Sequence, residues 1–278
     1  MADACRETAA TERLEPQQVE KDFNLTRLIW SIAEVLGGSL LLKGGTCLSK
    51  VDYGFHRMSE DADFVFPREK MPSGRDAIAK VMGQLRHRIK KAADLVGVRL
   101  VEESRVLDKV KAAMDLAVEY ESRFEANDAG RILLQIEIRP VLREPRQVQM
   151  QQLLSGPLAA GYDKAYCWAL HADEVRAEKV RAAFTREEIR DFYDLQLFIN
   201  RNSDMNSEDF RLLVEKKLDE MGTPPLSRQH INFGKSKRQL QELEASIDTR
   251  LTVVRGGEPR FELGPVLSHF NELWGLRT

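Results

Sequence analysis

The chain of 278 residues has few cysteines, few aromatic side chains, no large excess of either charge and no long apolar run. Its three cysteines, Cys5, Cys47 and Cys167, are an odd number and lie far apart, which argues against a disulfide framework and a cysteine-based zinc site. Lys and Arg total 42 against 44 Asp and Glu, which excludes a blanket polycation and a charge-expanded disordered chain. Any nucleic-acid binding would therefore need a local basic patch.

Two further absences bear on location. No apolar stretch approaches the ~18 residues that a membrane span requires. Residues 1–16 mix basic and acidic side chains, unlike a secretory signal peptide. We therefore expect a cytoplasmic protein without a membrane partner.

Hydrophobic periodicity predicts an α/β (α+β) protein. Apolar residues recur at helical spacing over residues 19–36, and residues 61–66 alternate as in a strand. Further helices are expected at 73–95, 173–184, 186–200 and 207–221, and strands at 39–42, 98–101, 112–120 and 131–138. The predicted organisation is a flexible tail at 1–15, an α/β core at 16–165 and a helical domain at 166–278, with a Pro- and Gly-rich path over 139–166.

The turn after the apolar run at 39–42 is the first candidate for chemistry. Gly44, Gly45 and Thr46 stand between a predicted strand and a predicted helix. Backbone N–H groups left free at such a turn suit phosphate oxygens. The alternative interpretation is ordinary helix capping, with glycine making the turn and Thr46 the cap.

Asp61 and Asp63 form the second candidate. Carboxylates at positions i and i+2 of a strand project to the same side, about 7 Å apart, where they can share a divalent metal. Alone, the pattern is more typical of a solvated strand face. Together with the glycine turn, it predicts a site for Mg²⁺ and a nucleotide.

The same residues resemble a known family. The runs Lys43-Gly44-Gly45-Thr46-x-Leu48 and Arg57-x-Ser59-Glu60-Asp61-x-Asp63-Phe64 are similar to the signature of the AbiEii/AbiGii-type nucleotidyltransferase toxins. That family is a branch of the polymerase-beta-like nucleotidyltransferases and includes the MenT toxins. Glu20-Lys21-Asp22-Phe23 upstream, and Ala177-Glu178-Lys179 and Arg190-Asp191-x-x-Asp194 downstream, extend the resemblance over about residues 16 to 200.

The resemblance implies a polymerase-beta-like core with a mixed sheet, followed by a helical C-terminal domain. Gly45 and Thr46 would hold the triphosphate of an NTP, and Lys179 would contact the nucleotide. The implied nucleotide-binding set is Lys43, Gly44, Gly45, Thr46, Arg57, Ser59, Lys179 and Asp191. The implied catalytic set is Asp61, Asp63, Glu137, Lys179 and Asp194, with a two-ion Mg²⁺ site on Asp61, Asp63 and Glu137.

Some of these roles have alternatives. Glu137, on a predicted strand, completes the metal site or accepts a proton, or else faces solvent on an edge strand. Asp191 binds nucleotide or pairs with Arg190 or Arg186. Lys43 and Arg57 flank the site, where they screen the acidic cluster or touch phosphate.

The expected activity is Mg²⁺-dependent transfer of a nucleoside monophosphate from an NTP to an acceptor hydroxyl. The resemblance implies an RNA acceptor, the 3′ end of tRNA, and a toxin of a toxin–antitoxin or phage-defence system with a cognate antitoxin protein. The alternatives are a protein hydroxyl as acceptor, or a non-catalytic RNA-binding module. Candidate phosphate contacts are Arg86, Arg88, Lys90, Lys91, Lys216, Lys217, Lys235, Lys237 and Arg238, which equally fit solvated helix faces.

Overall fold

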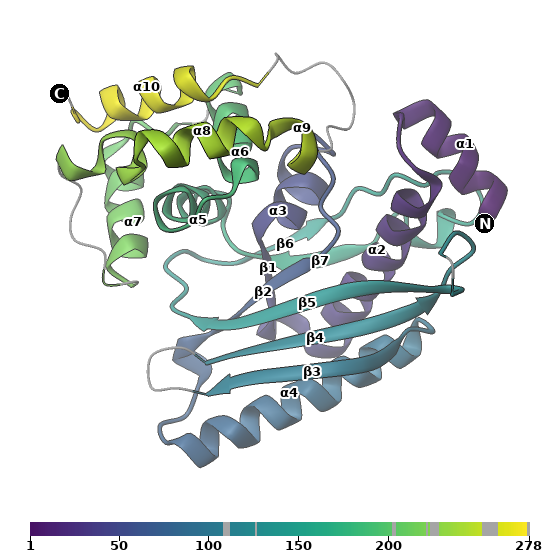
Figure 1. Ribbon diagram of the computed structural model, residues 1–278. Helices are drawn as coiled ribbons and strands as arrows, with labels where there is room; N and C mark the ends of the chain where they lie inside the picture. The colour runs from purple at the N-terminus through teal and green to yellow at the C-terminus, as the bar shows by residue number, and fades with distance from the viewer. Residues whose placement is uncertain are drawn as a thin grey trace. The chain divides into compact units, whose positions relative to one another are not determined.

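The computed structural model describes residues 1–107, 112–125, 127–201, 204–220, 222, 228–251 and 261–276. The expected helix end at Met221 and the expected separator at 223–225 lie outside this part of the chain. The chain divides into two compact units, Met1–His171 (unit 1) and Ala172–Thr278 (unit 2), whose α-helices and β-strands are labelled in Figure 1.

Unit 1 is built on a mixed seven-stranded sheet of order β3-β4-β5-β2-β1-β7-β6. The pairs β2–β5 and β1–β7 are parallel and the remaining neighbours are antiparallel, as the mixed-sheet prediction required. The strands are β1 (Leu41–Lys43), β2 (Ala62–Pro67), β3 (Arg99–Leu107), β4 (Ala112–Glu121), β5 (Ala129–Arg139), β6 (Arg146–Gln149) and β7 (Tyr166–Ala169).

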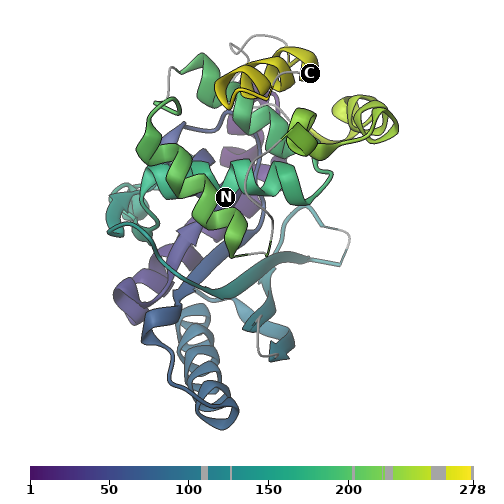
Figure 2. The same ribbon diagram turned by 90° about the vertical axis from the view of Figure 1, so that its left-hand side faces the viewer.

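Two long helices cover one face of this sheet. α2 (Pro16–Leu36) starts at a capping box between Glu15 and Gln18, and α4 (Arg75–Leu95) packs beside it. α4, drawn in blue, lies against β3 (Figures 1 and 2). Along β5 every second side chain is buried toward the helices. The alternate side chains are exposed up to Gln135 and partly buried at Glu137 and Arg139, so much of the opposite face is open for chemistry. Unit 1 also holds α1 (Ala2–Glu12), α3 (Gly44–Cys47), η1 (Gly37–Ser39), η2 (Leu48–Asp52), η3 (Arg68–Lys70) and η4 (Ala160–Tyr162).

The N-terminal residues differ from the flexible tail expected at 1–15. Residues 2–12 form α1, which packs on α2 and completely buries Cys5. Cys5 and Ala9 lie one helical turn apart, and their small side chains let the two helices approach closely. Two small residues are too weak a pattern to distinguish a docked helix from a polar tail.

The domain boundary expected at 165/166 falls just before β7, which pairs with β1 inside the sheet. Residues 166–171 therefore belong to unit 1 rather than to the helical part. β6 and β7 have only four residues each and lie within or next to the Pro- and Gly-rich path, so no alternation reveals them.

Unit 2 is helical in its described residues. Phe233 packs at its centre, with ring centroids 4.7 Å from Phe184, 5.3 Å from Phe192 and 5.4 Å from Phe270. No helix in the described parts of the chain is long and apolar enough to cross a bilayer. The elements of unit 2 are α5 (Ala172–Thr185), α6 (Ile189–Asn200), α7 (Glu208–Asp219), η5 (Arg228–Gly234), α8 (Lys237–Ala245), α9 (Ile247–Arg250) and α10 (Leu263–Leu273).

Candidate active site

The glycine turn and the acidic strand meet at one point. β1 and β2 pair antiparallel with Lys43 opposite Asp63, and Gly44 follows directly, with φ of +70°. A Cβ atom at Gly44 would lie 2.5 Å from Oδ2 of Asp63, so only glycine allows this approach. The backbone of the turn is thus placed against the carboxylate predicted to bind metal.

The rest of the turn is fastened to the loop that precedes β2. The Thr46 hydroxyl lies 2.8 Å from Ser59 Oγ and donates to the carbonyl of Asp61. A Cβ atom at Gly45 would lie 2.6 Å from a guanidinium nitrogen of Arg57, which is buried and also donates to the carbonyl of Met58. The structure therefore brings Arg57 and Ser59 to the same turn.

The close approach of Gly44 predicts a specific defect. Gly44→Ala is expected to displace the Asp63 carboxylate and to lower the activity predicted from the sequence, nucleotide transfer, by about 100-fold, the cost of ångström-scale misplacement. Gly37→Ala is the matched control, because Gly37 also has positive φ, +56°, but a Cβ atom there would meet nothing within 4 Å. Transfer of labelled nucleotide and thermal unfolding should be measured for both. Equal activity losses in the two variants would attribute the effect to backbone strain alone.

Asp61 and Asp63 supply the chemistry that a magnesium site needs. Asp61 is exposed just before β2, and Asp63 is partly buried within it. Partial burial raises the pKa of the Asp61 carboxyl; Lys21 opposes the rise and Asp63 adds to it. Mg²⁺ is usually held by one or two carboxylates together with substrate phosphates, which this pair beside the turn fits. Among the described residues, no group of three His, Cys, Asp or Glu side chains is gathered for a metal.

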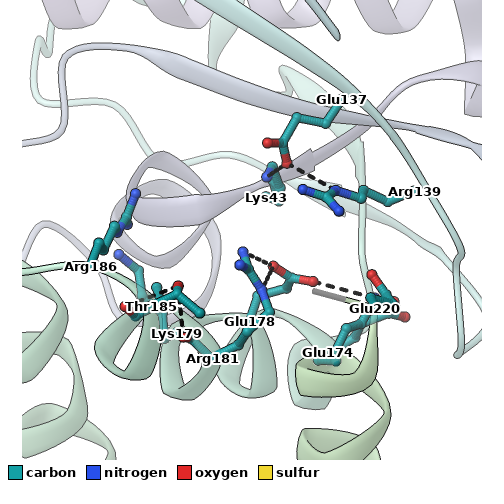
Figure 3. A network of polar contacts seen from close by, with 12 residues as sticks. Lys43, Glu137, Arg139, Glu174, Glu178, Lys179, Arg181, Thr185, Arg186 and Glu220 are labelled. Atoms are coloured by element: carbon teal, nitrogen blue, oxygen red, sulfur yellow. Dashed lines mark hydrogen bonds and ion pairs between the residues drawn. The ribbon is translucent and has the colours of Figure 1, made fainter. Parts of the chain in front are cut away.

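Glu137, expected as the third metal ligand, pairs with basic side chains in the structure. Its register on β5 puts it beside Val65, two residues along the strand from Asp63. Its carboxylate lies 2.5 Å from Lys43 Nζ and 3.6 Å from Arg139, the arrangement drawn in Figure 3. Glu137 thus holds the lysine that precedes the glycine turn. The alternative of a solvent-facing residue on an edge strand does not describe it, because β5 lies between β4 and β2.

The Glu-Lys-Asp run at the start of α2 has a role that no sequence argument assigned. Glu20 accepts hydrogen bonds from the Ser122 hydroxyl (2.6 Å) and the Arg123 amide (3.0 Å) at the end of β4. Lys21 pairs with Glu60 at 2.9 Å, next to Asp61. The available signals were charge within an apolar helical pattern and the resemblance of this run to the opening motif of the family.

Asp22 of the same run contacts the segment that follows the glycine turn. Its carboxylate lies 2.5 Å from Nζ of Lys50, and both side chains are about 1% exposed. Lys50 also donates to Thr26 at 2.7 Å, and the amide of Leu153 donates to Asp22 at 3.1 Å. Glu20, Lys21 and Asp22 thus connect α2 to the end of β4, to Glu60 before β2 and to η2.

In unit 2, one lysine joins the two downstream aspartates. Lys179 Nζ lies 2.8 Å from both Asp191 and Asp194, and all three side chains are buried. Arg186 donates two hydrogen bonds to Asp191, at 2.6 and 2.9 Å. This is the pairing predicted from the sequence as the alternative to nucleotide binding. Burial alone would raise the pKa of Asp191, but Lys179 and Arg186 outweigh it and lower the pKa. Figure 3 labels Lys179 and Arg186.

Two of the candidate phosphate contacts, Lys217 and Lys235, bind groups of unit 2 itself. Lys217 is 1% exposed and lies 2.7 Å from Glu174, with Glu178 and Glu220 within 3.3 Å. Lys235 is partly buried and donates to the carbonyl of Phe184. Lys216 next to Lys217 is exposed, so only the helical register distinguishes the two lysines.

A known family matches this chain over most of the residues described above. The family model described as nucleotidyl transferase AbiEii toxin of type IV toxin–antitoxin systems matches residues 28–270. The chain belongs to this family. The match begins after the Glu20–Phe23 run and continues past residue 200 into the C-terminal helices. The protein is therefore a nucleotidyltransferase of a toxin family.

A solved structure carries the same fold. MenT4, a nucleotidyltransferase toxin from Mycobacterium tuberculosis H37Rv, is similar with a TM-score of 0.63 at 17% sequence identity. The similarity covers 99% of this chain and 89% of that chain. At this identity the likeness concerns the fold alone. A comparison with curated proteins finds no match.

Proposed function

We propose that the AbiEii-family protein transfers a nucleoside monophosphate from an NTP to a hydroxyl at the 3′ end of an RNA, with tRNA as the acceptor and Mg²⁺ as the cofactor. The observation that carries this proposal is the contact between Gly44 and Asp63, which joins a turn suited to phosphate with a carboxylate suited to Mg²⁺. A cognate antitoxin protein would neutralise the activity, as the description of the family implies.

The proposed nucleotide contacts lie around the turn. The backbone of Gly45 and Thr46 would receive the triphosphate, and Arg57, packed against Gly45, would supply positive charge. Lys43 stands directly before the turn, and its pairing with Glu137 restricts where its ammonium lies. We therefore assign Glu137 the role of positioning Lys43.

The proposed reaction is an in-line substitution at the α-phosphorus. The acceptor oxygen forms a bond to phosphorus, the bond to the bridging oxygen breaks, pyrophosphate leaves, and the hydroxyl proton is lost to solvent. Mg²⁺ held by Asp61 and Asp63 would supply Lewis-acid stabilisation of the charge on the phosphate oxygens. The Lys21–Glu60 pair and the hydrogen bond from Thr46 to the Asp61 carbonyl restrain the loop that carries Asp61.

In unit 2 we propose Lys179 as a nucleotide-contacting lysine, following the family resemblance. Its two buried carboxylate partners, Asp191 and Asp194, would hold the ammonium group in one position. This assignment is independent of the proposal for Asp61 and Asp63, and a Lys179 variant should be tested separately for nucleotide binding.

A label-transfer assay tests the proposal. Purified protein is incubated with Mg²⁺, tRNA and each of the four labelled NTPs in turn, and we expect label in the RNA with one or two of them. Treatment with RNase should release the label, whereas protease should not. Label released only by protease would indicate a protein acceptor, and no transfer with any NTP would contradict the proposed function.

A further inference from the structure

A pocket of about 380 Å³ lies on the open face of the sheet, formed by β2, β5 and β4. The function described above uses only two of its residues. Its lining residues are Asp61, Asp63, Asp115, Leu116, Ala117, Arg131, Leu133, Leu134 and Gln135.

The pocket and the glycine turn lie on opposite sides of β2. In the sheet order β4-β5-β2-β1, Asp63 has Lys43 of β1 on one side and Gln135 of β5 on the other. Asp115 of β4 is the next residue in this row, opposite Gln135, and it accepts a hydrogen bond of 3.2 Å from the Gln135 amide. A nucleotide at the turn and a second substrate in the pocket would therefore reach the same carboxylate from opposite sides.

The exposed face of β5 offers three kinds of contact in sequence. Arg131, Leu133 and Gln135 alternate with buried residues, so they project to the same side at intervals of about 7 Å. Leu133 is 47% exposed, an apolar side chain on an otherwise polar face. These contacts match the parts of a nucleotide. The guanidinium suits a phosphate, the apolar surface suits a base, and the amide beside a carboxylate suits the ribose hydroxyls.

We propose that this pocket is the acceptor subsite and receives the 3′-terminal nucleotide of the RNA. This inference rests on the proposed function. The base lies against Leu133, a backbone phosphate lies at Arg131, and the ribose hydroxyls face Gln135 and Asp115. The terminal hydroxyl then points along the row toward Asp63. Arg131 favours RNA over a peptide as the acceptor, because an unmodified peptide has no phosphate for the guanidinium to bind.

Two variants test the subsite. Leu133→Glu replaces the apolar surface with a negative charge and should raise the KM for tRNA by at least about 10-fold, since it removes the apolar contact to the base and repels the RNA backbone. Arg131→Ala should weaken RNA binding and lower the slope of log Kd against log salt by about one. Affinity for Mg²⁺ and NTP, measured by equilibrium dialysis, should stay within about twofold in both variants.

Matched controls lie elsewhere on unit 1. Leu95→Glu changes a leucine that is 65% exposed on α4, and Arg75→Ala changes an exposed arginine at the start of that helix. Neither should alter KM or RNA affinity. Thermal unfolding of all four variants identifies any general loss of stability.

The outcomes separate this inference from the proposed function. If the wild-type protein transfers no label, the proposed function fails, and direct tRNA binding by the four variants still decides whether the pocket holds RNA. Unchanged KM and RNA affinity in Leu133→Glu and Arg131→Ala would overturn the subsite. Weaker NTP binding in both would instead assign the pocket to the nucleotide, and loss of protein labelling would assign it to a peptide.

Discussion

Asp63→Asn is expected to lower nucleotide transfer by about 100- to 1,000-fold, the scale on which single groups that stabilise developing charge act. The substitution keeps the shape of the side chain but removes the negative charge opposite Lys43 and beside Gly44. Mg²⁺-dependent NTP binding should weaken with it, because the carboxylate supplies one of the two proposed metal ligands. Both quantities are measured with the labelled NTP that the wild-type protein uses.

A matched control separates the site from general charge effects. Asp76→Asn removes the same charge from an exposed aspartate in the first turn of α4 and should leave transfer unchanged. Circular dichroism and thermal unfolding should show both variants folded. Full activity in Asp63→Asn would contradict the assignment of the acidic pair to metal binding.

Lys217→Met is expected to destabilise unit 2 by about 3–5 kcal/mol, because it leaves buried carboxylates without their cation. Lys217 lies within 3.3 Å of Glu174, Glu178 and Glu220, and its own side chain is 1% exposed. Burial alone would lower the pKa of Lys217, but the three carboxylates raise it, so the ammonium form is favoured. Urea unfolding, with hydrogen exchange of peptides from α5 and α7, measures the loss in unit 2.

The neighbouring lysine is the control. Lys216→Met removes the same charge from the exposed side of α7 and should change the free energy of unfolding by less than about 0.5 kcal/mol. Equal effects of the two substitutions would contradict a structural role for the buried lysine. RNA binding that falls in Lys217→Met without loss of stability would restore its interpretation as a phosphate contact.

Long amphipathic elements were predictable because their periodicity is repeated many times. α2 and α4 each extend over 21 residues, and β5 alternates through 11, so helix and strand patterns are unambiguous there. α1 and the four-residue strands β6 and β7 were not predictable. Their positions depend on partners far away in the chain, such as the pairing of Leu42 with Ala169.

The chemistry of the candidate site was visible in the local sequence, because Gly44-Gly45-Thr46 and Asp61-x-Asp63 each carry their residue types at short spacing. Both the family and the enzyme class followed from these runs and are supported by the match over residues 28–270. The register between strands could not be predicted from this local spacing. That register puts Gly44 against Asp63, and Glu137 with Lys43.

The difference between the two levels has a physical cause. Turn chemistry and side-chain type depend on neighbours a few residues apart, so the amino-acid order alone determined the glycine turn and the acidic pair. The resemblance of these runs to a known family then predicted the enzyme class. Which charges are buried together depends on long-range packing. Only the tertiary structure therefore decided that Lys217 is internal while Lys216 is exposed, that Asp22 holds Lys50, and that Arg131, Leu133 and Gln135 line a pocket beside the acidic pair.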